Sequence, residues 1–194
     1  MTATAAFVPD EKKLRELIVY LAVKCQDDER FGGVKLNKML YMIDMFAYAE
    51  TGKPVTGVEY MKQKAGPVPR RFLPAKRELL DEGAIFEVEV PVYGVPNPLR
   101  RIIPQRKADL TLFTADEIAH TDSILDMCRE FTGTALSAYS HEHLGWRIAP
   151  KMGDTIPYSA VFLSEDPVSD YEVARAEMLI KEHDWDVRGR VLPH

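Results

Sequence analysis

Residues 35–41 read Lys-Leu-Asn-Lys-Met-Leu-Tyr, and this stretch decides how the middle of the chain folds. Its apolar residues recur three and four positions apart, which is the spacing of one face of an α-helix. The apolar set is Leu36, Met39, Leu40 and Ile43. Gly52, followed by Pro54, is a typical helix stop. The sequence therefore predicts a helix over about residues 34–50, with Lys35 and Lys38 off its apolar side.

Two turn segments follow this helix. Residues 52–57 read Gly-Lys-Pro-Val-Thr-Gly, and residues 66–69 read Gly-Pro-Val-Pro. Proline fixes one backbone angle and removes an amide donor, so the second segment predicts a rigid turn that leads into a helix. Neither segment contains a nucleophile–base pair, a metal-ligand cluster or a phosphate-binding loop. Their composition favours a shaped binding surface over an active site.

The remaining elements follow from periodicity and capping residues. Helices are predicted over about residues 10–26, 70–82, 115–131, 135–141 and 167–183, and strands over 56–64, 84–92 and 99–104. Asp10 is a suitable N-cap for the first helix, and Thr114 with Glu117 forms a capping box. We expect an α+β fold: a predominantly α-helical single domain with a small β-hairpin or three-stranded sheet.

Length and composition are those of a globular protein without a membrane span. The chain has 194 residues, of which 46% are hydrophobic, and no apolar run approaches 18 residues. Residues 1–9 carry no basic residue, so no secretory signal is expected. Cys25 and Cys128 lack a nearby Cys or His companion, which predicts reduced, buried thiols in a cytoplasmic protein.

Charge is unevenly distributed along the chain. The net charge is −5, but residues 61–77 hold six basic residues and no acid, whereas the stretch after Leu163 holds eight acids against four bases. The basic stretch fits a docking patch for an acidic protein, or a phosphate contact in a nucleic-acid-binding regulator that uses residues 62–77. It also fits a solvated surface. The candidate partner-binding residues are Lys62, Lys64, Arg70 and Arg71, with Lys35 and Lys38 on the preceding helix.

Two short patterns resemble catalytic or metal sites, and both are incomplete. His141 and His143 are two residues apart, whereas zinc-binding histidines on a helix are usually four apart. Ser137, Ser140, His141 and Asp154 could be arranged as a hydrolase triad, but the Gly-x-Ser-x-Gly elbow is missing. We expect a non-catalytic protein with no metal and no cofactor.

The order of these short sequence words is similar to the Panacea domain family, also called the SocA-like or phage-associated GepA-like family. The words are Lys-Leu-x-Lys-x-Leu-Tyr from Lys35, Gly-x-Pro-Val-Thr-Gly from Gly52 and Gly-Pro-Val from Gly66. Later words are Leu136-Ser137, Ser140-His141, Trp146 and Ile156-Pro157-Tyr158.

The resemblance implies three segments: an N-terminal helix and loop over residues 1–33, the family domain over 34–163, and a C-terminal helix and tail over 164–194. It further implies an antitoxin that neutralises a cognate protein toxin. In some members such a domain acts as an adaptor that hands the toxin to an ATP-dependent protease. The expected partners are therefore a toxin and such a protease, rather than nucleic acid or a membrane.

Overall fold

The computed structural model describes residues 7–94, 97–167 and 169–182, and these fall into two compact units. One unit spans residues 7–162 and contains all elements except the last helix. The other contains α7 (Asp170–Glu182), which begins at Asp170 rather than near Pro167 as predicted. The predicted end of this helix at His183 lies outside the described residues. The expected α+β, mostly helical class is confirmed.

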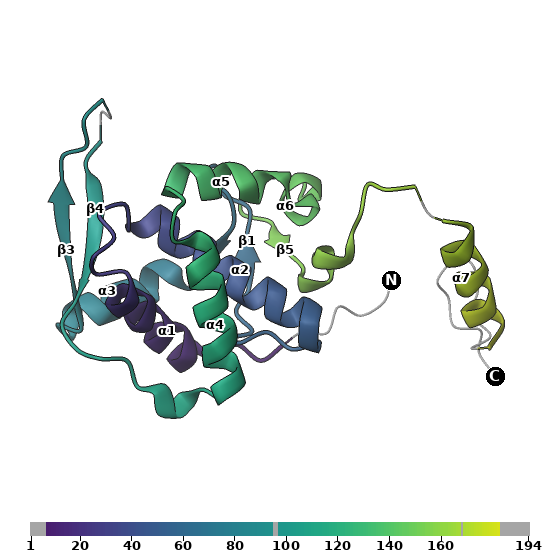
Figure 1. Cartoon of the computed structure of the whole chain (residues 1–194), viewed down its shortest axis with the longest axis horizontal. Helices are drawn as coiled ribbons and strands as arrows, with labels where there is room; N and C mark the ends of the chain where they lie inside the picture. The colour runs from purple at the N-terminus through teal and green to yellow at the C-terminus, as the bar shows by residue number, and fades with distance from the viewer. Residues whose placement is uncertain (1–6, 95–96, 168, 183–194) are drawn as a thin grey trace. The chain divides into compact units, whose positions relative to one another are not determined.

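Helix α2 (Gly33–Thr51), which the sequence predicted over about residues 34–50, is the centre of the larger unit (Figure 1). It contacts α1 (Glu11–Lys24), α4 (Ala115–Cys128) and α5 (Gly133–Glu142). Its residues are buried on almost every side from Lys35 to Met45, so it is a core helix and not a half-exposed one. Gly52 ends it in the left-handed conformation at φ 74°, and its N–H donates to the Tyr48 carbonyl.

The other helix ends follow the sequence signals closely. The Asp10 side chain accepts a bond of 2.9 Å from the Lys13 N–H and caps α1. Thr114 and Glu117 form the reciprocal capping box at the start of α4. The remaining helical segments are α3 (Phe72–Asp81), α6 (Leu144–Ile148) and the 3-10 turns η1 (Leu110–Leu112) and η2 (Tyr158–Phe162).

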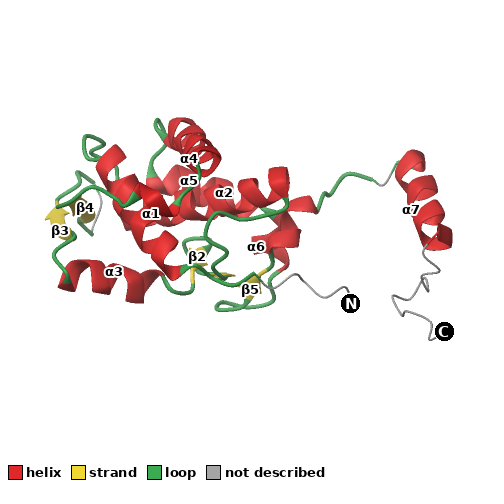
Figure 2. Cartoon of the chain, turned by 90° about the horizontal axis from the view of Figure 1, so that it is seen from below, coloured by secondary structure: helices red, strands yellow, loops and turns green. Residues whose placement is uncertain are grey.

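A small antiparallel sheet joins two strands that are close in sequence to one that lies about 90 residues further on. Its order is β2 (Val68–Pro69), β1 (Tyr60–Met61), β5 (Thr155–Ile156), seen near α6 in Figure 2. The predicted strand over 56–64 shortens to two residues. The Thr56 N–H donates to the Asp44 carboxylate in α2, and the Thr56 carbonyl accepts from the N–H of Asp10, the N-cap of α1. These main-chain groups are therefore not free to pair with a neighbouring strand.

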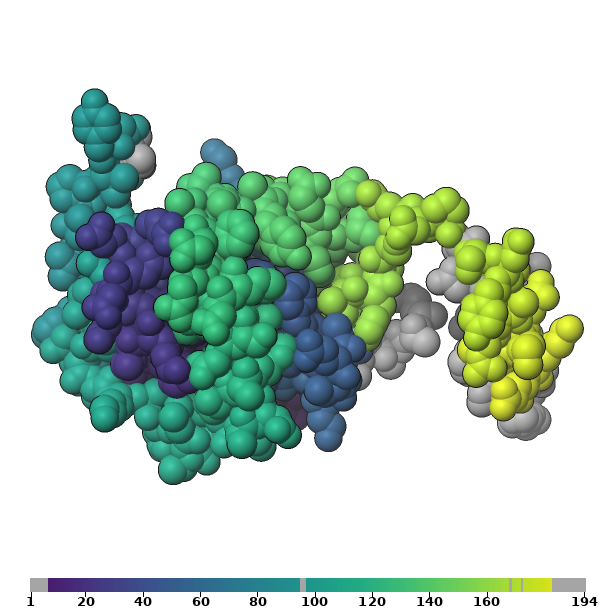
Figure 3. Space-filling model, in the orientation of Figure 1, coloured from purple at the N-terminus to yellow at the C-terminus, as the bar shows by residue number. Residues whose placement is uncertain are grey.

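The second sheet is the predicted hairpin of β3 (Ile85–Val90) and β4 (Leu99–Pro104). Ile85 and Ile102 lie on one face and are buried in the core. The distal part of the hairpin stands away from the helices, as the space-filling view shows (Figure 3). Among the described helices, none is both long enough and apolar enough to cross a membrane.

Candidate functional site: a loop clasped by three side chains

The loop of residues 63–67, here called the clasped loop, connects β1 to β2 and is fixed by side chains from three helices. Three of its five carbonyl oxygens accept hydrogen bonds from α2, α5 and α6. The bonds are Lys38 Nζ to Pro67 O at 2.8 Å, Ser137 Oγ to Ala65 O at 2.8 Å and Trp146 Nε1 to Gln63 O at 3.1 Å. A loop held at three alternate residues keeps one fixed shape, and a group that is fixed in advance loses less entropy when it binds anything.

The side chains that hold this loop are here called the clasp, and Lys38 is the most deeply buried of them. Its side chain is only 1% exposed and its amino group reaches the Pro67 carbonyl directly beneath the loop. Burial lowers the pKa of Lys38 to about 7. Gly66 has φ +97°, and a Cβ there would overlap Ser140 Oγ and lie 2.7 Å from Lys38 Cε. Only glycine therefore lets the loop close over this lysine.

Lys62 and Trp146 form the second part of the clasp. The Lys62 amino group lies 4.5 Å from the centre of the Trp146 ring and donates to the Ala149 carbonyl at 2.8 Å. His141 stacks on Trp146 with ring centres 4.1 Å apart. The indole of Trp146 thus contacts both the Lys62 amino group and the stacked His141 imidazole.

A buried carboxylate supports the clasp from below. Asp44 is fully buried and accepts bonds from the Thr56 N–H at 2.7 Å, from the Thr56 hydroxyl and from the Tyr60 hydroxyl at 2.8 Å. Tyr158 from η2 adds a bond of 3.3 Å. Burial raises the pKa of Asp44, and these donors oppose that rise. The group, here called the Asp44 network, ties α2 to β1 and to η2.

The serines and histidines of the sequence patterns are structural here. Tyr41 Oη and His143 Nδ1 are 2.8 Å apart, so His143 contacts α2 while His141 contacts Trp146. Ser140 lies inside α5 and donates to the Ser137 carbonyl at 2.8 Å. Neither described serine hydroxyl donates to a histidine, so the hydrolase arrangement does not form.

Two of the six candidate binding residues are placed differently from the expectation. Lys35 and Lys38 are each 1% exposed, so the expectation that they lie on an open helix face is wrong. Lys35 Nζ contacts Asp28 at 2.6 Å and the Arg129 carbonyl at 3.0 Å, which caps the C-terminal end of α4. Each of these buried lysines donates a hydrogen bond to a main-chain carbonyl oxygen that a neighbouring segment supplies, Lys38 to Pro67 and Lys35 to Arg129.

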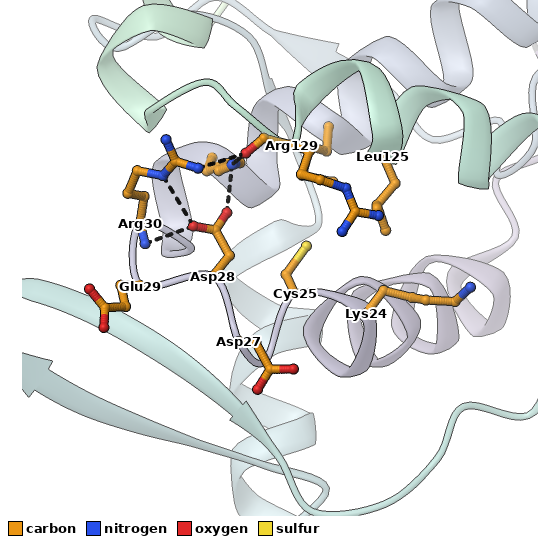
Figure 4. A pocket seen from close by; sticks show the side chains of 10 residues that line it. Lys24, Cys25, Asp27, Asp28, Glu29, Arg30, Leu125 and Arg129 are labelled. Carbon is orange, nitrogen blue, oxygen red and sulfur yellow. Dashed lines mark hydrogen bonds and ion pairs between the residues drawn. The ribbon is translucent and has the colours of Figure 1, made fainter.

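The cavity beside Lys35 is lined by charges that already pair with one another. Figure 4 shows Arg30 and Asp28 meeting next to Arg129 and Cys25 in a cavity of about 400 Å³. Burial alone would raise the pKa of Asp28, but bonds from Lys35 and Arg30 hold it below its ordinary value. Cys25 and Cys128 are free and buried, as expected, and burial raises the pKa of each thiol to about 11. Such thiols are unreactive.

The other four candidate residues surround the clasped loop, but most of their charge is paired. Arg70 lies 3.0 Å from Glu59 and Arg71 lies 2.9 Å from Glu11, while Lys62 is engaged as described above. Lys64 is exposed at the tip of the loop and makes no hydrogen bond or ion pair with the residues that the structure describes. It is therefore the cation of this set with most freedom to bind a partner.

The sequence did not predict the exposed apolar residues on the segment that follows α6. Gly153 donates to the Lys62 carbonyl, which places residues 148–153 beside the loop. Ile148 is 57% exposed and Met152 is 53% exposed in that segment. The exposed side chains of Lys64 and Ala65 on the loop, and of Ile148 and Met152 on the segment that bonds to Lys62, are here together called the loop surface. No spacing in the sequence could reveal it, because it depends on contacts between residues more than 80 positions apart.

Comparison with known proteins gives one match. The family described as antitoxin SocA-like, Panacea domain, matches residues 36–147, which include most of α2, the clasped loop and all three side chains that hold it, those of Lys38, Ser137 and Trp146. Comparisons with curated proteins and with solved structures found no match. Because the match covers more than half of the chain, the protein belongs to the SocA-like, Panacea-domain antitoxin family.

Proposed function

We propose that this protein is a non-catalytic antitoxin that binds a cognate protein toxin through the loop surface. Family membership supports the antitoxin role in general. The observation that supports this particular surface is the clasp itself: Lys38, Ser137 and Trp146 all serve to fix one short exposed loop. A protein that only needed to close β1 onto β2 would not need donors from three helices for this turn.

The chemistry of the loop surface indicates what it would contact. Lys64 supplies one cation that has no partner among the described residues, and Ile148 and Met152 supply exposed apolar area on the segment that bonds to Lys62. Exposed apolar groups beside a charge suit a partner patch with an acidic group at the edge of an apolar contact. The proposed toxin therefore presents an acidic and apolar surface, and the binding takes place in the cytoplasm.

The test uses the full-length protein and the toxin encoded in the adjacent reading frame. Co-expression should restore growth, and the two proteins should co-purify. Lys64→Glu should weaken the affinity by about tenfold or more, which corresponds to ~1.4 kcal/mol, and should slow association. The measurement is binding kinetics at low and at moderate salt, combined with a growth assay.

Lys12→Glu is the matched control, because Lys12 is also exposed but lies on α1 outside the loop surface. It makes the same change in net charge and should alter the affinity less than about twofold. Equal effects of the two reversals would show that only overall charge matters, and the loop surface would then lose its support. A protein that neither rescues growth nor binds the toxin would refute the antitoxin role.

Delivery of the toxin to an ATP-dependent protease is a second step of the proposal, and it rests on the family resemblance alone. The prediction is a shorter toxin half-life in cells that contain the antitoxin than in cells that lack it. A half-life that depends on the protease but not on the antitoxin would remove the adaptor step. The neutralising contact could still stand.

The alternative is a nucleic-acid-binding regulator that uses the basic residues 62–77. Three of the six basic residues in this stretch are already in ion pairs: Arg70 and Arg71 pair with glutamates, and Lys76 lies 2.7 Å from Glu87. Few cations are left to release counterions from a phosphate backbone, so nucleic-acid affinity should be weak and should fall steeply with salt. Tight, salt-tolerant binding to one DNA or RNA sequence would favour the regulator.

A further inference from the structure

Lys38 is a buried lysine without a carboxylate partner among the described residues. Its amino group donates to the Pro67 carbonyl at 2.8 Å. Lys35, one turn earlier on α2 and equally buried, contacts the Asp28 carboxylate at 2.6 Å. A carboxylate offsets the cost of burying an ammonium group, whereas a single carbonyl oxygen offsets much less of it. The charged form of Lys38 is therefore poorly stabilised beneath the clasped loop.

The described side chains around Lys38 do not supply the missing negative charge. Burial alone lowers the pKa of Lys38 to about 7, without a contribution from a charged neighbour. Asp44, the buried acid of the same helix, accepts bonds from Thr56 and Tyr60 instead. The titratable groups on the segments packed around the lysine are those of Tyr41 on α2, Lys62 and Lys64 at the loop, His141 and Glu142 on α5, and His143 before α6. Glu142, the acid among them, is exposed.

The segment that covers Lys38 has few main-chain bonds of its own. Gly66 lies directly over the lysine, since a Cβ there would be 2.7 Å from Lys38 Cε and 2.9 Å from Nζ. Within the five residues of the clasped loop the structure gives one main-chain bond, from the Gly66 N–H to the Gln63 carbonyl at 2.9 Å. The flanking strands β1 and β2 are two residues long. A segment of this kind opens locally at less free energy than the core beneath it.

We propose that the clasped loop is a pH-sensitive lid, and that above neutral pH its opening is coupled to the uptake of one proton by Lys38. In the closed loop the buried amino group is mostly neutral above pH 7, because burial lowers its pKa to about 7. In the open loop water solvates the amino group, and its pKa returns toward 10.5.

The direction of the pH effect follows from the protons that each form binds. Between pH 7 and pH 10 the open form holds more protons than the closed form, so a rise in pH favours the closed form. The equilibrium constant for opening should fall by up to about tenfold per pH unit in this range. Below pH 7 Lys38 is protonated in both forms, and the dependence disappears. The inference concerns the motion of the loop and requires no toxin, so it can fail independently of the antitoxin role.

The test is hydrogen exchange at the Gly66 amide, measured by NMR on the full-length protein between pH 7.5 and pH 9. Amide exchange is catalysed by hydroxide, so over this range its rate rises about thirtyfold when the opening equilibrium is constant. At Gly66 the falling opening constant should cancel most of that rise, and the rate should change by less than about threefold. Gly52 is the internal control, because its N–H bonds to the Tyr48 carbonyl at the end of α2, outside the clasp. Its rate should show the full rise.

Two variants identify the group that titrates. In Lys38→Met the Gly66 rate should rise about thirtyfold over the same range, whatever its absolute value. Lys35→Met is the matched control, because it removes an equally buried lysine of α2 that lies outside the clasp, and it should keep the flat profile at Gly66. If a variant does not fold, the comparison of Gly66 with Gly52 in the wild type still decides.

Three results would overturn the proposal. The first is a thirtyfold rise at Gly66 in the wild-type protein, and the second is a flat profile that persists in Lys38→Met. The third is exchange at Gly66 as slow as at the slowest amides of α2, because the opening would then be global unfolding and not the motion of a lid.

Discussion

Gly66→Ala is the substitution that examines the clasp most directly. Gly66 has φ +97°, where a side chain is strained, and the new methyl group would meet the buried ends of Ser140 and Lys38. Lys38 cannot swing away without leaving the Pro67 carbonyl, because its amino group is buried and its bond to that oxygen is 2.8 Å. Either the loop moves or the lysine loses its acceptor.

The size of the effect follows from three contributions: backbone strain, restriction of the unfolded chain and the steric clash. A non-glycine residue in the left-handed region loses about 1–2 kcal/mol, and restriction of the unfolded chain returns about 0.4–1 kcal/mol. Forcing a methyl group into a filled space adds about 1–3 kcal/mol. We therefore expect Gly66→Ala to lower the free energy of unfolding by about 2–4 kcal/mol, a large part of the stability of an ordinary domain.

Gly153→Ala separates the clash from the backbone strain. Gly153 has φ +89°, and a Cβ there would meet nothing within 4 Å. It should lose only about 1 kcal/mol in urea unfolding at constant pH, because the strain is similar and the space is open. If the two alanine variants lose the same free energy within about 0.5 kcal/mol, the clasped loop is not tightly held and the reasoning is wrong. In a Ser140→Ala background the loss at Gly66 should become smaller.

Two further predictions concern the buried ionisable groups. Burial lowers the pKa of Lys38 to about 7 from 10.5, so above pH 7 the unfolded chain keeps a proton that the folded chain releases. Stability should therefore rise between about pH 7 and pH 8.5, by at most ~1.4 kcal/mol per unit from this group, and Lys38→Met should remove that rise in urea unfolding measured across the range. Asp44→Ala leaves the Thr56 N–H and the Tyr60 hydroxyl without their shared acceptor, and should cost about 2–4 kcal/mol in the same assay. A loss below about 0.5 kcal/mol would mean that water or a neighbour replaces the carboxylate.

Local sequence signals were sufficient for most of the helical framework. The capping residues Asp10 and Thr114 and the stop at Gly52 mark helix ends that the structure confirms, because caps act within one turn of the chain. The hairpin was also predictable, since alternation and proline positions are local. The strand over 56–64 was not, because the Thr56 main chain bonds to Asp10 and Asp44, which lie far away in the sequence.

The burial of Lys35 and Lys38 could not be predicted from their helix alone. A lysine beside an apolar stripe is normally exposed, and periodicity places both off the stripe. The two amino groups can be buried because they donate hydrogen bonds to carbonyl oxygens. Lys38 donates to Pro67 and Lys35 donates to Arg129, which lie about 30 and 90 residues further along the chain. The resemblance to a family was informative here in a way that periodicity was not, because Lys38, Gly66, Ser137 and Trp146, which meet in the clasp, come from four separate words of that pattern.

The clasp also explains why the loop surface is a suitable place for partner recognition to vary. Lys38, Ser137 and Trp146 hold the loop through its carbonyl groups, which every residue type carries. The side chains of Lys64 and Ala65 are exposed and take no part in that support. Substitution at these two positions can therefore change the charge and shape that the loop would offer to the proposed toxin, while the loop keeps its backbone. In such an arrangement, specificity for the partner and stability of the fold depend on different atoms of the same five residues.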